Sequence, residues 1–265
     1  MIDKIIKTKE KIITFTDNEI RYSGSFVIKE DLRPNELSPV EISTGINEKS
    51  ASYLGKINLI SKSISEGKII VLPAKTVYGI SCRYDSEESL KKVYEIKGRK
   101  EGVPFIILIS DLRDIEMFAD TSSLDLNEKE SLFSVIDYYW NKKDPDPLTI
   151  VFKKNPFLKS FITGGKNTVA IRRSEFKFVR DIIDFCGPII STSATLSSLK
   201  ASPAGIEEIP VKIVDSADLV VRLDSRLLGL ESTIADFSSF PGKPTLIRQG
   251  AVAFDDVLQK MQIKI

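Results

Sequence analysis

Short apolar runs alternate with longer stretches of helical periodicity from about residue 54 onward. Between residues 54 and 64, apolar side chains recur every three or four positions, the spacing of one helix face, and Gly67 is suited to end that helix. The next run, 69–72, is continuously apolar, as in a strand buried on both faces. This alternation predicts an α/β domain.

The same two patterns predict most of the remaining elements. A helix is expected between Asp85 and Gly98, with Asp85 and Glu88 as a capping box and Gly98 as its terminator. Further helices are expected at 126–140, 176–185 and 254–261. Further strands are expected at 105–109, 148–152, 169–171, 188–192, 217–223, 232–236 and 245–248.

The first 50 residues have a different pattern. Two short strand-like runs, 11–15 and 20–29, flank the turn-forming pair Asp17-Asn18. A polar connector with proline, serine and glycine follows between residues 33 and 45. We therefore expect a small N-terminal β extension and linker over residues 1–50, and one α/β domain over residues 51–265.

The chain contains no histidine, and this absence limits its chemistry. It excludes Ser-His-Asp and Cys-His catalysis and the His-Glu-x-x-His zinc site. A reaction must therefore depend on Lys, Arg, Ser, Thr, Asp and Glu, or on groups of the substrate itself. The formal net charge of +1 argues against strong nonspecific binding to nucleic acid, although it is compatible with a local basic patch.

Cysteine content and hydropathy indicate the compartment. Cys82 and Cys186 are far apart, so two reduced thiols are expected rather than a disulfide, and no metal ligands are predicted. The N-terminus lacks the apolar core of a signal peptide. No run approaches the roughly 18 apolar residues of a membrane span. We therefore expect a cytoplasmic protein that does not act on a membrane.

The segment from Leu72 to Ile109 holds the strongest candidate chemistry. In it, an apolar strand, a polar turn and a predicted helix lead to Lys97-Gly98-Arg99, and a second apolar run follows. Paired cations at a helix end, next to strands, suit an α/β site that handles phosphate. The alternative is that both cations only stabilise the helix dipole.

Seven segments of the chain have a distinctive composition and order. They are Pro73-Ala74-Lys75-Thr76-Val77-Tyr78-Gly79, Lys97-Gly98-Arg99 with Pro104-Phe105-Ile106-Ile107, Asp146-Pro147-Leu148-Thr149, Val169-Ala170-Ile171-Arg172, Gly187-Pro188-Ile189-Ile190-Ser191-Thr192-Ser193-Ala194-Thr195, Glu231-Ser232-Thr233-Ile234 and Leu246-Ile247-Arg248-Gln249-Gly250. This series resembles the motifs of the YrdC-like family of threonylcarbamoyl-adenylate synthases over roughly residues 54–252. The resemblance implies an α/β fold with a twisted mixed sheet flanked by helices.

The resemblance also implies an activity that needs no histidine. In that family, the amine of L-threonine combines with bicarbonate to give a carbamate. The carbamate oxygen attacks the α-phosphate of ATP and expels pyrophosphate, as a step toward N6-threonylcarbamoyladenosine in tRNA. The implied substrates are ATP with Mg²⁺, L-threonine and bicarbonate, and the implied partners include tRNA and a downstream threonylcarbamoyl transferase.

Roles follow from the matched motifs. The implied catalytic residues are Lys97, Arg99 and Ser193. The implied nucleotide-binding residues are Lys97, Arg99, Thr195 and Arg248. The implied residues for threonine or its carbamate are Thr76, Arg172, Ser193 and Ser232. Among them, Arg172 would clasp the threonine carboxylate in a fork, a geometry that guanidinium supplies and ammonium does not.

The departures from the family pattern fall at ligand positions. Ala74 and Lys75 stand where the family has threonine and an acidic residue. Leu108 stands where many members have histidine, and Thr195 stands where asparagine is usual. Because Ala74 and Leu108 remove polar contacts from the threonine side, polyanion binding is more firmly indicated than threonine specificity.

Two other functions stay open at this point. One is a non-catalytic YrdC-like protein that binds double-stranded RNA on a basic wall. This wall would consist of Lys91, Lys92, Lys97, Arg99 and Lys100. Such a run of charges is more often a solvated helix face. The other is a carbamoyl- or acyl-adenylate enzyme with a different acceptor, because a fold does not determine its ligand.

Overall fold

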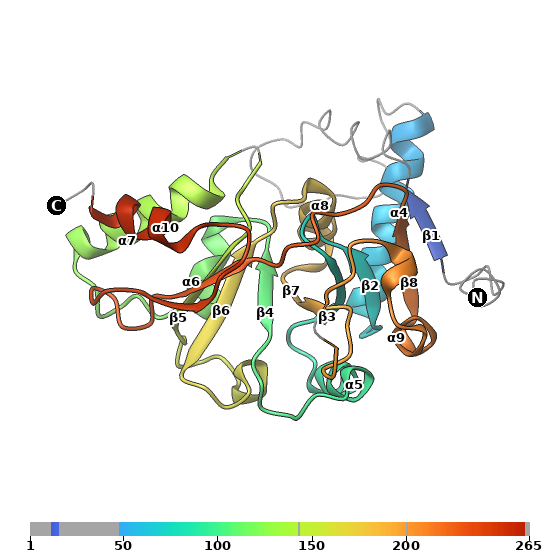
Figure 1. Ribbon diagram of the computed structural model, residues 1–265, viewed down its shortest axis with the longest axis horizontal. Helices are drawn as coiled ribbons and strands as arrows, with labels where there is room; N and C mark the ends of the chain where they lie inside the picture. Colours follow the sequence, from blue (N-terminus) through green and yellow to red (C-terminus); the bar gives the residue numbers. More distant parts are fainter. Residues whose placement is uncertain (1–11, 16–47, 143, 200, 263–265) are drawn as a thin grey trace.

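The computed structural model describes residues 12–15, 48–142, 144–199 and 201–262. Its strands are β1 (Ile12–Phe15), β2 (Ile70–Pro73), β3 (Tyr78–Arg83), β4 (Ile106–Ile109), β5 (Leu148–Lys153), β6 (Thr168–Arg173), β7 (Ile189–Ser193), β8 (Leu219–Leu223), β9 (Thr233–Asp236) and β10 (Thr245–Arg248). Within the described residues they form one ten-stranded sheet in the order β1-β8-β2-β3-β7-β4-β6-β5-β9-β10 (Figure 1). Parallel pairs such as β4 with β6 occur beside antiparallel pairs such as β3 with β7, so the sheet is mixed.

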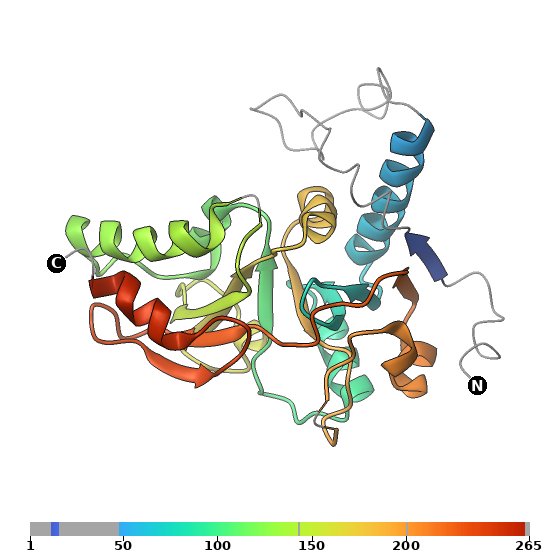
Figure 2. The same cartoon turned by 45° about the horizontal axis from the view of Figure 1, so that its top comes forward.

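Helices cover both faces of the sheet. They are α4 (Glu48–Ser65), α5 (Glu87–Lys97), α6 (Ile115–Phe118), α7 (Leu126–Trp140), α8 (Lys177–Cys186), α9 (Val211–Ser216) and α10 (Phe254–Gln262). In β2, Ile70 and Leu72 pack in the core that α4 and α8 cover, whereas Val71 packs in the larger core of the opposite face. Helices α7 and α10 lie side by side over that larger core (Figures 1 and 2). The expected α/β class, with a mixed sheet flanked by helices, is confirmed.

One strand was not predicted as a separate element. Between the predicted strand 69–72 and the predicted helix that begins near Asp85, only a polar turn was expected, but the chain reverses after Pro73 and β3 pairs antiparallel with β2. The reversal is closed by the Ala74 amide, which donates to the Val77 carbonyl at 3.1 Å. Tyr78, Ile80 and Cys82 alternate with Gly79, Ser81 and Arg83, which is the two-residue period of a strand, so the sequence did contain a signal for β3.

The predicted capping box of α5 is wrong at its first residue. Ser86 is the N-cap, and its hydroxyl oxygen accepts from the Ser89 amide at 3.2 Å. The Asp85 carboxylate instead pairs with the guanidinium of Arg83, whose Nε donates to Asp85 Oδ1 at 2.6 Å. The predicted end of the helix is confirmed, because Gly98 adopts a left-handed conformation with φ +59°.

The structure describes only part of the region for which an N-terminal β extension was predicted. The predicted strand 11–15 corresponds to β1, which pairs parallel with β8, and its Phe15 packs edge-on against Phe178 of α8 at 4.8 Å. Strand β1 therefore belongs to the same sheet as the α/β domain. The predicted strand 20–29 and the polar connector lie outside the described residues, and the division at residue 50 stays a prediction. No helix of the described part is long and apolar enough to cross a membrane.

Candidate active site

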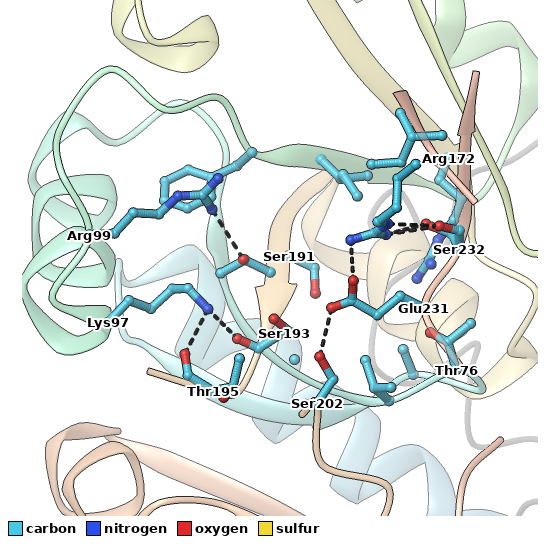
Figure 3. A pocket seen from close by; sticks show the side chains of 18 of the residues that line it. Thr76, Lys97, Arg99, Arg172, Ser191, Ser193, Thr195, Ser202, Glu231 and Ser232 are labelled. Carbon is cyan, nitrogen blue, oxygen red and sulfur yellow. Dashed lines mark hydrogen bonds and ion pairs between the residues drawn. The ribbon is translucent and has the colours of Figure 1, made fainter. Parts of the chain in front are cut away.

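Eight residues predicted from the sequence line one pocket with a volume of about 500 Å³. They are Thr76, Lys97, Arg99, Arg172, Ser193, Thr195, Ser232 and Arg248. They come from the β2–β3 turn, the end of α5, strands β6, β7 and β10, and the segment that enters β9. The volume is typical of a pocket for a small molecule or cofactor. Figure 3 shows Lys97 and Arg99 on one side of this pocket and Arg172 with Ser232 on the other.

Lys97 is a buried cation that holds the turn after β7. Only 4% of the residue is exposed, and its Nζ donates to the carbonyls of Ser193 at 2.5 Å and Thr195 at 2.9 Å. Burial, reinforced by the nearby charge of Arg99, lowers the pKa of Lys97 to about 8, while Glu231 opposes this shift. An ammonium group has three donors, so one remains for a ligand.

Arg99 is held more loosely than Lys97. Its guanidinium lies over the Phe105 ring, 5.0 Å from the centroid, and its nitrogens make only long contacts, 3.5 Å to the Thr192 hydroxyl and 3.4 Å to the Pro104 carbonyl. Burial lowers the pKa of Arg99, but an arginine stays protonated at neutral pH. The stacked guanidinium is therefore a positioned cation with donors available to an anion.

Arg172 lies at the other end of the pocket with its donor groups available. Strand β6 places it beside Leu108 of β4, the residue paired with it in the sheet. Its Nε faces Glu175 without a hydrogen bond, and the nearest oxygen of Glu175 is 3.6 Å away. Its two terminal amino groups make no hydrogen bond to the described residues. The fork of this arginine is thus available to a planar anion such as a carboxylate.

Arg248 lies with Arg172 rather than with Lys97 and Arg99. It forms a short ion pair with Glu231, and its Nη2 donates to the Ser232 carbonyl at 2.9 Å and to the Ser232 hydroxyl at 3.2 Å. Burial first, and then the charge of Arg172, lower the pKa of Arg248, whereas Glu231 raises it. Each guanidinium has a carboxylate partner, Glu175 for Arg172 and Glu231 for Arg248, so this end of the pocket offers directed hydrogen-bond donors without a large net positive charge.

The hydroxyl groups of the pocket differ in their partners. The Ser232 hydroxyl is already bonded to that of Thr149 at 2.8 Å. Thr195 is 8% exposed, and its Oγ1 has no hydrogen-bond partner among the described residues. Ser193 and Thr76 both line the pocket, and Thr76 is almost fully buried. Since a buried hydroxyl without a partner is costly, Thr195 is a candidate for a ligand contact.

Sequence reasoning missed Glu231 and Ser202 as pocket residues. The Ser202 hydroxyl donates to Glu231 Oε1 at 2.7 Å (Figure 3). The other carboxylate oxygen of Glu231, Oε2, accepts a hydrogen bond from the guanidinium of Arg248. Glu231 opens one of the matched motifs, which was the available signal. Ser202 stands in a loop without periodicity, so the sequence contained no signal for it. Gly250 lies so close that a Cβ there would be 2.3 Å from the Glu231 carbonyl oxygen, which fixes the backbone of this segment.

The departures from the family pattern are distributed unevenly around the pocket. Ala74, Leu108 and Thr195 all line it, and Leu108 is 1% exposed. Lys75 is instead exposed, with its Nζ 3.9 Å from Asp144. The changes at Ala74 and Leu108 therefore make part of the pocket apolar, whereas Lys75 is directed away from it.

The described residues contain no group of three or more acidic or cysteine side chains that would hold a metal ion. Glu231 is the one carboxylate among the described pocket residues, and both of its oxygens already have partners. Magnesium is commonly held by only one or two carboxylates together with substrate phosphates and water. The pocket residues do not by themselves form a Mg²⁺ site, so a Mg²⁺ ion here would need ligands from a bound phosphate group and water.

The proposed basic wall is partly neutralised by its own helix. Lys91 forms an ion pair with Glu87 at 2.9 Å, and Lys92 forms one with Glu88 at 2.8 Å, each one helical turn apart. All four side chains are exposed, so these pairs are weak, but they reduce the local excess of positive charge. This helix face therefore resembles a solvated surface more than an RNA-binding stripe.

Comparison with known proteins places the chain in a family. A family model described as "Telomere recombination", which groups Sua5, YciO and YrdC proteins, matches residues 62–250. The solved structure of Pyrococcus abyssi Sua5 complexed with L-threonine has a TM-score of 0.67 at 28% identity, and the match covers 78% of this chain and 57% of that one. The Escherichia coli YciO structure, at 19% identity and TM-score 0.64, covers 77% of this chain and 93% of that one and shows the shared fold. The chain belongs to the Sua5/YciO/YrdC family.

Related sequences are named for one activity. Threonylcarbamoyl-AMP synthase of Pyrococcus abyssi is 29% identical over 213 residues, which cover 80% of this chain and 59% of that protein. A putative threonylcarbamoyl-AMP synthase of Methanocaldococcus jannaschii is 30% identical over 196 residues, covering 74% of this chain and 86% of that protein. The chain thus spans less than two thirds of the Pyrococcus protein and most of the Methanocaldococcus one.

Proposed function

We propose that this chain is an ATP-dependent L-threonylcarbamoyl-AMP synthase that acts in the N6-threonylcarbamoyladenosine modification of tRNA. The observation that carries the proposal is that eight residues predicted from the sequence line a single pocket. The names of the relatives support the same activity. The expected cytoplasmic location and the transfer of the product to a threonylcarbamoyl transferase are parts of this proposal.

The two cationic ends of the pocket suit two anionic substrates. Lys97 and Arg99 bind the triphosphate of MgATP, with Mg²⁺ held mainly by phosphate oxygens and water. Arg172 takes the threonine carboxylate in its open fork. Arg248 lies next to Arg172 and neutralises charge where the carbamate meets the α-phosphate, which refines its expected role on the nucleotide side.

The reaction needs positioning more than it needs a nucleophile from the protein. Threonine and bicarbonate condense to the carbamate with loss of water, and the carbamate oxygen displaces pyrophosphate from the α-phosphate of ATP. Holding two reactants in line and neutralising the developing phosphate charge are contributions that fixed cations and hydroxyl groups make. Ser193 and Thr195 belong to the turn that Lys97 fixes, so their hydroxyl groups lie at the junction of the two substrates.

The decisive experiment measures pyrophosphate and AMP-adduct formation from ATP, with threonine and bicarbonate omitted in turn. We expect release only when both are present, and a loss of about 10²- to 10³-fold in Lys97→Ala. Lys92→Ala is the matched control, because Lys92 is an exposed lysine of the same helix. Release without either co-substrate, or its absence under every condition, would contradict the proposal.

The two alternative functions predict different results, one in the release assay and one in a separate RNA-binding assay. Release that follows another amino acid more strongly than threonine would identify a different acceptor. RNA binding that persists at about 0.15 M salt and is unaffected by ATP would favour an RNA-binding protein. The pairing of Lys91 and Lys92 with glutamates disfavours that second outcome.

A further inference from the structure

The pocket has several cations but one carboxylate. Among the described residues that line it, Glu231 is the only acidic one. An α-amino acid is a zwitterion, so a site that recognises it needs a partner for its ammonium group as well as for its carboxylate. A role for Glu231 in this recognition rests on the proposed function, because it concerns the amino-acid end of the same pocket.

Glu231 is held in place but keeps capacity to accept hydrogen bonds. Its Oε1 accepts from the Ser202 hydroxyl at 2.7 Å and its Oε2 from Arg248. An ionised carboxylate has about four lone-pair positions, so two remain for further donors. The close contact of Gly250 with the Glu231 backbone fixes the position of the segment that carries it.

Glu231 also lies at the correct end of the pocket. It precedes Ser232, and both are bonded to Arg248, which is close enough to Arg172 for the two charges to interact. Figure 3 shows Glu231 below Arg172 and Ser232 on the same side of the pocket, with Ser202 below Glu231. The carboxylate and amino group of an α-amino acid are separated by a single carbon, so neighbouring protein groups of opposite charge can bind both.

A comparison with Glu175 indicates that Glu231 is more than a counter-ion for arginine. The Glu175 side chain is 0% exposed, does not line the pocket, and lies 3.6 Å from the Nε of Arg172, as a structural partner would. The Glu231 side chain is 29% exposed and lines the pocket. One carboxylate therefore lies behind the cations, and the other lies where a ligand binds.

We propose that Glu231 binds the α-ammonium group of the amino-acid substrate while Arg172 binds its carboxylate. In this arrangement Glu231 selects amino acids over other small carboxylates. Ser202 orients the Glu231 carboxylate and is a positioning residue.

The test compares two ligands that differ only at the amino group. Binding of L-threonine and of 2,3-dihydroxybutanoate, in which a hydroxyl replaces the amine, is measured by calorimetry on the full chain. The wild type is expected to prefer threonine by about tenfold to hundredfold, the range of a hydrogen bond to a charged group. Glu231→Gln is expected to reduce this preference to about twofold or less, whereas Ser202→Ala, which keeps the charge, retains most of it.

Two results would contradict the proposal in distinguishable ways. If Glu231→Gln weakens both ligands equally and keeps the preference for threonine, Glu231 only orders Arg248, and the proposed function is unaffected. If the wild type binds neither ligand with or without ATP, the proposed function itself fails. A circular-dichroism melt of each variant separates loss of binding from loss of folding.

Discussion

Arg172 and Glu175 form an ion pair with a nitrogen–oxygen distance of 3.6 Å, and the two side chains are only 7% and 0% exposed. The Arg172 Nε and both oxygens of Glu175 lack hydrogen-bond partners among the described residues. Attraction between the charges therefore compensates their burial without the usual hydrogen bonds. The charges of this pair already cancel, so a ligand on the pocket side would bind Arg172 through the free donors of its guanidinium fork and not through net charge.

The first prediction concerns the stability of this pair. Glu175→Leu leaves Arg172 buried without its counter-ion and should lower the free energy of unfolding by about 3 kcal/mol. The double variant Arg172→Met with Glu175→Leu should lose much less than the sum of the single variants, because an apolar pair can replace a buried ion pair. Urea unfolding of the wild type, the single variants and the double variant measures this, and strictly additive losses would show that the pair is not coupled.

The second prediction is a pH dependence of ATP binding. Since burial lowers the pKa of Lys97 to about 8, this lysine loses its charge at a pH where an exposed lysine keeps it. We expect the affinity for ATP to be nearly constant below pH about 7.5 and to fall as the pH rises through about 8. Calorimetric titrations across this range provide the measurement. In the Lys97→Arg variant the affinity for ATP should no longer fall in this pH range. If it still falls, another group is responsible for the pH dependence.

The lowered pKa of Lys97 also affects the stability of the fold, which should rise with pH whereas the affinity for ATP falls. The folded-state pKa of about 8 lies below the ordinary lysine value of 10.5, so folding favours the neutral form of Lys97. In the pH window between these values the unfolded chain binds more protons, and stability therefore rises with pH. Lys97→Met should reduce this slope in the ligand-free protein, which urea unfolding at several pH values measures.

The third prediction concerns the hydroxyl of Thr195. Because Oγ1 is buried without a partner in the described part of the chain, Thr195→Val should not destabilise the ligand-free protein and should stabilise it by about 1 kcal/mol. If that hydroxyl contacts the substrates, pyrophosphate release should fall about tenfold at the same time. A thermal melt and the release assay test both parts. Lower stability would mean that the hydroxyl has a partner in the folded protein.

The fourth prediction concerns amino-acid selectivity. Leu108 pairs with Arg172 in the sheet and Ile234 also lines the pocket, so the side chain of a bound amino acid has apolar neighbours. An apolar site discriminates only about 10²-fold against an isostere that differs by a hydroxyl. Valine should therefore replace threonine in the release assay with a specificity constant lower by no more than about 10²-fold. A ratio near about 10⁴ would instead indicate a dedicated hydrogen bond to the threonine hydroxyl.

Much of the fold follows from local sequence. Helix α7 has the predicted bounds, 126–140, because its acidic N-cap and apolar periodicity are both local features. The end of α5 at Gly98 depends on a single glycine conformation, and it too was predicted. Strand β3 and the N-cap of α5 were not predicted. The alternation of β3 was a local signal that was missed, whereas the choice of Ser86 over Asp85 as the N-cap depends on side-chain pairing, because Arg83 holds Asp85.

The sequence by itself determined which cations and hydroxyl groups are present, that histidine chemistry is excluded, and in what order the motifs occur. Only the tertiary structure decided how these groups are paired. The pairing of β9 with β10 brings Glu231 and Ser232 to Arg248, and the strand order β6-β5-β9-β10 places these residues in the same part of the sheet as Arg172. The physical reason is that residue type and spacing set local geometry, whereas charge pairing depends on distances between segments that are far apart in the chain. Those distances are set by the strand order of the sheet.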